Sequence, residues 1–97
     1  MTIDKVIEEL EVSLTMKVLM ASLKGYGFAI ISDRQVHEFG APIAHVTVLA
    51  SNPKYPALMV TYTFDEAEGD LIFDLKVRTG RLVPVTTYQF HETKEAN

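Results

Sequence analysis

The chain of 97 residues contains no cysteine and no tryptophan. The absence of cysteine excludes disulfide bonds, thiolate metal sites and cysteine nucleophiles. No apolar run reaches the roughly 18 residues that a membrane-spanning helix needs. The opening stretch MTIDKVIEEL carries acidic residues where a signal peptide carries basic residues and then an apolar segment. We therefore expect a cytoplasmic protein that does not contact a membrane.

Basic residues are in the minority, since 9 Lys and Arg face 13 Asp and Glu and give a formal net charge of −4. This balance argues against non-specific binding to nucleic-acid backbones. The sequence also lacks a P-loop, a dinucleotide-binding fingerprint and a Gly-x-Ser-x-Gly motif. The acidic stretch DEAEGD (65–70) lacks the residue order of an EF-hand calcium loop. We therefore expect no cofactor, no metal and no nucleic-acid partner, and we find little support for catalysis.

Apolar residues make up 47% of the chain, enough to build one packed core, so we predict a single domain over residues 1–97. Apolar residues recur at helical spacing from Ile3 to Leu23, which predicts one helix over residues 2–23. Within it, EVSLTMKV (11–18) alternates polar and apolar residues, as a strand does. Whether residues 12–20 form helix or strand therefore stays open.

The remainder of the chain predicts strands and short connections. SNPKYPA (51–57) contains two prolines and predicts a loop, and DRQVHEFG (33–40) predicts an irregular or helical piece. The links EAEG (66–69) and TG (79–80) are short enough to close hairpins. The predicted strands span residues 27–32, 41–50, 58–65, 70–78 and 81–91, and a polar tail follows at 92–97.

The predicted fold class is α+β, with the N-terminal helix packed on one face of a five-stranded, mostly antiparallel, curved sheet. A helix of 22 residues is about 33 Å long, and a strand of nine residues reaches about 30 Å, so the two layers match in length. This order of elements broadly resembles the helix-plus-curved-sheet folds of the cystatin and NTF2-like groups. The resemblance implies a two-layer architecture and no particular activity.

The pattern Thr-Tyr-x-Phe-x-Glu occurs twice, as TYTFDE (61–66) and TYQFHE (87–92). Alternate residues of a strand share a face, so Tyr62 and Phe64 lie together, as do Tyr88 and Phe90. The predicted register places Phe64 opposite Leu71 and directs these aromatic residues toward the helix. We interpret the repeat as one layer of aromatic core residues contributed by two strands, rather than as a duplicated functional site.

The opposite, outer face of the sheet mixes threonine with apolar residues, and an apolar patch on a small protein often marks an interface. The predicted hairpins also place Arg78 opposite Arg81 and Asp65 opposite Asp70, and like charges directly across a strand pair are unfavourable. A two-fold dimer would bring the acidic turn of one copy near the basic turn of the other. We therefore predict a non-catalytic interaction or accessory protein that forms a homodimer through this face. The predicted interface residues are Thr61, Ile72, Val83, Val85 and Thr87, with Arg78 and Arg81 at the rim.

Two other functions remain open. The first is a small-molecule-binding protein or simple enzyme with an apolar pocket between helix and sheet, in which methionines make the wall adaptable. The pocket residues would be Met16, Met20, His45, Tyr62 and Tyr88. The second is a small acidic inhibitor that mimics nucleic acid. In addition, Tyr55 lies between Lys54 and Pro56 in the predicted loop and is a candidate contact for another protein.

Overall fold

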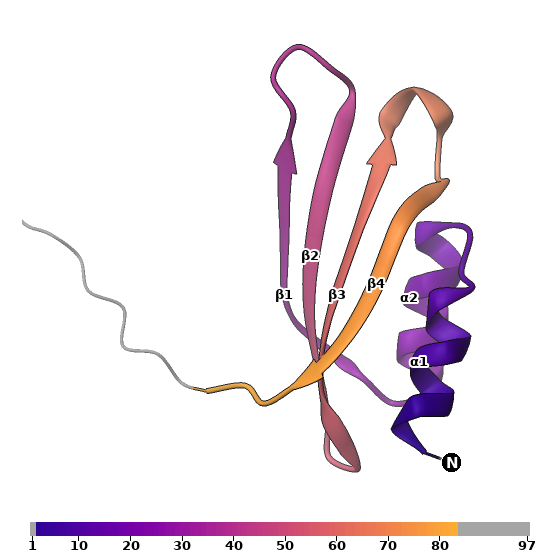
Figure 1. Cartoon of the computed structure of the whole chain (residues 1–97), viewed down its shortest axis with the longest axis vertical. Coiled ribbons are helices and arrows are strands. Elements are labelled where there is room, and N and C mark those ends of the chain that lie inside the picture. The colour runs from indigo at the N-terminus through magenta and orange to yellow at the C-terminus, as the bar shows by residue number, and fades with distance from the viewer. Residues whose placement is uncertain (1, 84–97) are drawn as a thin grey trace, which may run out of the picture.

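The computed structural model describes residues 2–83, and Figure 1 shows their arrangement. Two helices come first and a four-stranded antiparallel sheet follows, with the strands ordered as they occur in the chain. The α+β class with N-terminal helices is therefore confirmed. The elements are α1 (Ile3–Glu11), α2 (Met16–Gly25), β1 (Ala29–His37), β2 (Ile43–Asn52), β3 (Tyr55–Asp65), the 3-10 turn η1 (Glu66–Glu68) and β4 (Ile72–Gly80).

The prediction of one helix over residues 2–23 is wrong, because the helix is interrupted after Glu11. Thr15 starts the second helix as its N-cap, since its side-chain oxygen accepts a hydrogen bond from the amide of Val18 at 3.1 Å. A threonine in this role satisfies an amide that has no partner within the helix. The apolar spacing continues across the interruption, so periodicity alone does not reveal it.

The connection between the helices pairs with the start of β4. The amide of Ile72 donates to the carbonyl of Leu14, and the amide of Met16 donates to the carbonyl of Asp70, both at 3.0 Å. Thr15 and Leu71 form an isolated antiparallel bridge. The strand-like alternation of EVSLTMKV therefore corresponds to a short extended piece, which stops one helix and caps the next.

Replacing Thr15 by alanine is expected to lower the free energy of unfolding by about 1 kcal/mol, because the Val18 amide loses its capping oxygen. Thr15→Ser is the matched control, because it keeps the hydroxyl group. Urea unfolding followed by circular dichroism measures both variants. Equal stability of the alanine and serine variants would show that the cap contributes nothing.

Two connections in the sheet differ from the predictions. The predicted loop 51–57 is mostly strand, because β2 continues to Asn52 and β3 begins at Tyr55. The Asn52 side-chain oxygen closes this turn by accepting from the Lys54 amide at 2.8 Å. The predicted irregular piece 33–40 is mostly strand too, since β1 runs on to His37. All residues of β1 are exposed. Polar residues are tolerated there because β1 is an edge strand.

The register between β3 and β4 is shifted by one residue from the predicted one. Phe64 lies opposite Ile72, so Ile72 faces the core at 8% exposure, whereas Leu71 is 52% exposed and Phe73 is 45% exposed. A β-bulge then restores the phase at Asp74, whose φ of +53° is in the left-handed region. As a result Val77 lies within the core and Leu75 packs against it.

The predicted turn at Thr79-Gly80 is wrong, because both residues belong to β4 and lie opposite Leu58 and Ala57 of β3. Residues 81–83 follow β4 without entering a strand. The rest of the predicted fifth strand and the predicted tail lie outside the described residues. Neither described helix has the length and apolar content needed to cross a lipid bilayer.

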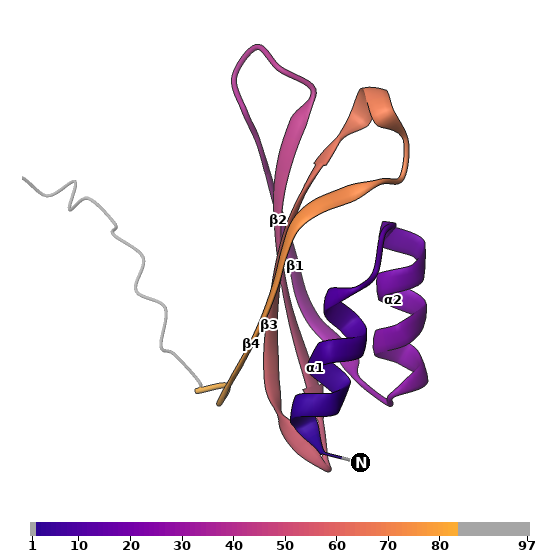
Figure 2. The same ribbon diagram turned by 45° about the vertical axis from the view of Figure 1, so that its right-hand side comes forward.

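One hydrophobic cluster joins the helices to the sheet. Its sheet residues come from one side, which we call the inner face, and Figure 2 shows both helices on that side. Tyr62 and Phe64 are buried in this cluster, which confirms the core reading for the first copy of the aromatic repeat. Among residues 2–83, the buried apolar residues are Val6, Leu10, Leu19, Leu23, Phe28, Ala44, Val46, Val48, Ala50, Leu58, Val60, Tyr62, Phe64, Ile72 and Val77.

Candidate functional site

The side of the sheet away from the helices, the outer face, is formed by alternate residues of β2, β3 and β4 (Figure 2). Their side chains are partly or fully exposed, except Thr63, which is buried. Two shallow hollows lie along it, with volumes of about 570 Å³ and 380 Å³. The outer-face residues are His45, Thr47 and Leu49 of β2, Met59, Thr61 and Thr63 of β3, and Phe73, Lys76 and Arg78 of β4.

The larger hollow is polar. His45 is held at its edge by two contacts, because Nδ1 lies 3.2 Å from the Thr63 hydroxyl and Nε2 lies 3.5 Å from a carboxylate oxygen of Glu38. The bulge places Asp74 in the same hollow as the cations of β4. Its polar lining residues are His45, Thr47, Thr61, Thr63, Asp74, Lys76 and Arg78. Hydroxyl groups beside charges of both signs suit a polar surface of a partner protein.

The smaller hollow lies toward the end of β4 and is mainly apolar. Leu49, Met59 and Leu82 contribute apolar side chains, and Arg78 and Arg81 border them. Arg78 lines both hollows, so the two adjoin at this residue. An apolar patch with basic neighbours is typical of protein interfaces, whose rims are polar.

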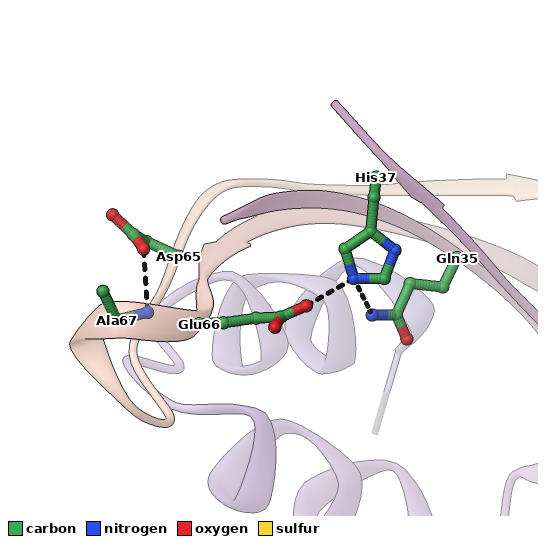
Figure 3. A network of polar contacts seen from close by, with 5 residues as sticks. All are labelled: Gln35, His37, Asp65, Glu66 and Ala67. Carbon is green, nitrogen blue, oxygen red and sulfur yellow. Dashed lines mark hydrogen bonds and ion pairs between the residues drawn. The ribbon is translucent and has the colours of Figure 1, made fainter. Parts of the chain in front are cut away.

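The second cluster of polar side chains lies at the end of the inner face. Figure 3 shows Glu66 of η1 reaching His37 of β1, whose Nε2 atom also lies 3.3 Å from the Gln35 side-chain nitrogen. His37 pairs with Ala44 of β2, the strand between β1 and β3, and the alanine side chain takes little space. The Asp65 carboxylate accepts from the Ala67 amide at 2.9 Å and so fixes the turn that presents Glu66.

An imidazole beside a carboxylate can accept or donate a proton. Both His37 and Glu66 are half exposed, and among residues 2–83 no group of three or more metal-ligating side chains accompanies them. The hollows described above lie on the other face of the sheet. The His37–Glu66 pair is therefore separated from both hollows by the sheet.

Three of the predicted pocket residues lie in or against one hydrophobic cluster. Tyr62 belongs to the core, and burial, reinforced by the charges of Asp33 and Asp70, raises the pKa of its phenol above the usual value. Met16 and Met20 pack against the same core. His45 lies on the outer face instead, and Tyr88 lies outside the described residues.

The predicted interface residues are divided between the faces. Thr61 and Arg78 lie on the outer face, and Arg81 and the exposed Val83 follow near the apolar hollow. Ile72 was expected there too, but the shifted register buries it on the inner face. Val85 and Thr87 lie outside the described residues.

Two further expectations about contacts are corrected. Arg78 does not face Arg81 across a turn, because Arg78 pairs with Met59. Asp70 accepts a hydrogen bond from the Lys17 amide at 3.3 Å, so this carboxylate caps α2. Tyr55 begins β3, and its ring stacks on Phe28 with centroids 5.9 Å apart, so its contact with another protein stays a prediction.

Sequence reasoning missed the Gln35, His37 and Glu66 cluster. The alternation of Asp33, Gln35 and His37 was the available signal, because it places three polar side chains on one face of a strand. Glu66 could not be assigned to them, since its position depends on pairing across three strands. Compared with protein-family models, curated proteins and solved structures, the chain matches none.

Proposed function

We propose that the chain is a non-catalytic interaction protein that binds a second copy of itself through the outer face of its sheet. The observation that carries the proposal is that this face holds threonine and apolar side chains around two hollows, with both helices on the opposite side (Figure 2). Apolar surface of this kind commonly marks a protein interface.

We infer that the two helices cover the inner face and leave the outer face for binding. Along β2 the inner residues Ala44, Val46 and Val48 are buried, whereas the outer residues His45 and Thr47 are not. A sheet face that remains in water usually carries more charged side chains than this one. Two such faces can pack about 10 Å apart with interdigitated side chains.

Charges of both signs on the outer face support self-association. Asp74 lies in the same hollow as Lys76 and Arg78. A two-fold axis through the face would place each Asp74 near the cations of the other copy. Complementary charges of this kind fix the orientation of a complex and suppress other partners.

Replacing Thr61 by glutamate tests the proposal, because it adds a larger, ionised side chain in the middle of the proposed interface, where its carboxylate would have to lose water on association. We expect the dissociation constant for self-association to rise about a hundredfold or more. Val18→Glu is the matched control, since it adds the same charge to an exposed site on α2. Light scattering after size exclusion gives the mass of each variant.

Mass measurements at low and high salt complete this test. If charged pairs contribute, salt weakens the association. A wild-type monomer at all concentrations would overturn the proposal, and so would a wild-type complex whose mass Thr61→Glu and Val18→Glu leave equally unchanged.

A further inference from the structure

The two edge strands of the sheet differ in how their outward-facing backbone groups are used. On β4, the amide of Ile72 donates to the Leu14 carbonyl at 3.0 Å. The amide of Val77 donates to the Glu11 carboxylate at 3.2 Å. The end of α1 and the connection to α2 therefore occupy this edge, and a further strand would have to displace them.

Within residues 2–83, β1 has a paired strand on one side only, namely β2. The amide of Glu38 donates to the Ile43 carbonyl at 2.9 Å, so the backbone groups of Glu38 point toward β2. Because this direction alternates along an antiparallel strand, the backbone groups of Asp33, Gln35 and His37 point away from the sheet. All residues of β1 are exposed, and none of the described elements lies along this edge (Figure 1).

A long open edge is a template for another strand. We propose that β1 pairs with β1 of a second copy, antiparallel and about a two-fold axis at Gln35, so that two sheets become one continuous sheet. The inference goes beyond the proposed function, since it adds a second surface that does not involve the outer face. Both pairs of helices would lie on the same side of the joined sheet, because the axis is perpendicular to it.

The polar side chains of β1 favour this register. With the axis at Gln35, each Asp33 lies opposite His37 of the second copy, and the two Gln35 side chains face each other. These are the three residues whose outward backbone groups are available, so each opposed pair can exchange both N–H···O bonds. On the other face, Arg34 lies opposite Val36 of the second copy.

The neighbouring registers are less favourable. An axis at Asp33 or at Arg34 places like charges directly opposite each other, which destabilises a strand pair. An axis at Val36 leaves Asp33 and Arg34 opposite residues that follow the end of β1. The register at Gln35 therefore places Asp33 opposite the imidazole of His37, avoids pairs of like charge and keeps each of these pairs within β1.

Gln35→Pro tests the edge directly. Proline removes the outward-facing amide of residue 35 and leaves the hydrogen bonds between β1 and β2 in place, which is why edge strands tolerate it. We expect the edge contact to be lost at micromolar protein concentration, with an unchanged circular dichroism spectrum. Gln35→Thr is the control, because it keeps the backbone amide and introduces a side chain that favours strands.

A charge exchange tests the register. Asp33→Lys places a cation opposite His37 of the second copy and is expected to weaken the edge contact about three- to thirtyfold. Adding His37→Glu to that variant, with Glu66→Gln to remove the carboxylate that contacts residue 37 in the same chain, restores opposite charges, so the combined variant should regain the association. This rescue depends on the pairing of these two positions, and it keeps the proposal testable if the proline variant does not fold. Failure of the combined variant to recover would overturn the register.

The masses of the wild-type protein and its variants in solution distinguish the edge proposal from the outer-face proposal. A tetramer that either Gln35→Pro or Thr61→Glu reduces to a dimer supports both surfaces. A dimer that only Gln35→Pro splits supports the edge and overturns the outer-face proposal. A dimer that only Thr61→Glu splits overturns the edge proposal, and a wild-type monomer overturns both.

Discussion

Replacing Leu19 by alanine is expected to lower the free energy of unfolding by about 2–5 kcal/mol. Leu19 is 0% exposed and is among the largest fully buried side chains of the described residues. It lies on α2, a helix of 10 residues, and helices this short depend on packing for their stability. Its removal leaves a cavity where the helices meet the sheet.

Val18→Ala is the matched control for this change, because Val18 is the preceding residue on the same helix and is 49% exposed. Its loss should change stability by less than about 0.5 kcal/mol, as is usual for surface substitutions. Urea unfolding of both variants measures the difference. Domains of this size have only about 5–15 kcal/mol in total, so the Leu19 variant should melt far earlier. Similar losses at both positions would contradict the assigned core.

The second large effect is expected at Gly27, where alanine should cost about 1.5–3 kcal/mol. The φ of Gly27 is +86°, a conformation that side chains with a Cβ atom rarely adopt. The added Cβ would also lie 3.1 Å from the Asn52 side-chain nitrogen. That nitrogen donates to the Tyr26 carbonyl at 2.8 Å, so the substitution strains the backbone and disturbs this hydrogen bond.

Gly25→Ala provides a control of opposite sign. Gly25 is the last residue of α2, and an added Cβ there meets nothing within 4 Å among the described residues. Alanine should stabilise the protein by about 0.5–1 kcal/mol, because it restricts the unfolded chain and suits the helix. Thermal or urea unfolding of the two variants tests the sign. If both alanine substitutions stabilise the protein, the left-handed conformation assigned to Gly27 is wrong.

Much of the local structure follows from the sequence. Thr2 precedes the first apolar residue of the helical pattern, a position typical of a helix cap, and its side chain accepts from the Lys5 amide. Tyr62 and Phe64 were expected on the covered face of their strand, and both are buried. These predictions hold because helix caps and strand alternation depend on residues only a few positions apart.

The candidate site was less predictable than the elements that carry it. Thr61 and Arg78 were placed on the outer face correctly, whereas Ile72 was not. A shift of one residue in register exchanges the faces of a strand, and the alternating pattern of β4 fits both choices. Only the pairing of Ile72 with Leu14 and Phe64 selects one of them.

By itself, the sequence determined the class of fold, the order of the helical and sheet segments and the apolar face of β3, because these depend on local periodicity. The tertiary structure decided the interruption before Thr15, the bulge at Asp74 and the meeting of His37 with Glu66. It also decided which edge of the sheet is occupied. Each of these features depends on hydrogen bonds or contacts between residues far apart in the chain, and such pairings cannot be inferred from local sequence patterns.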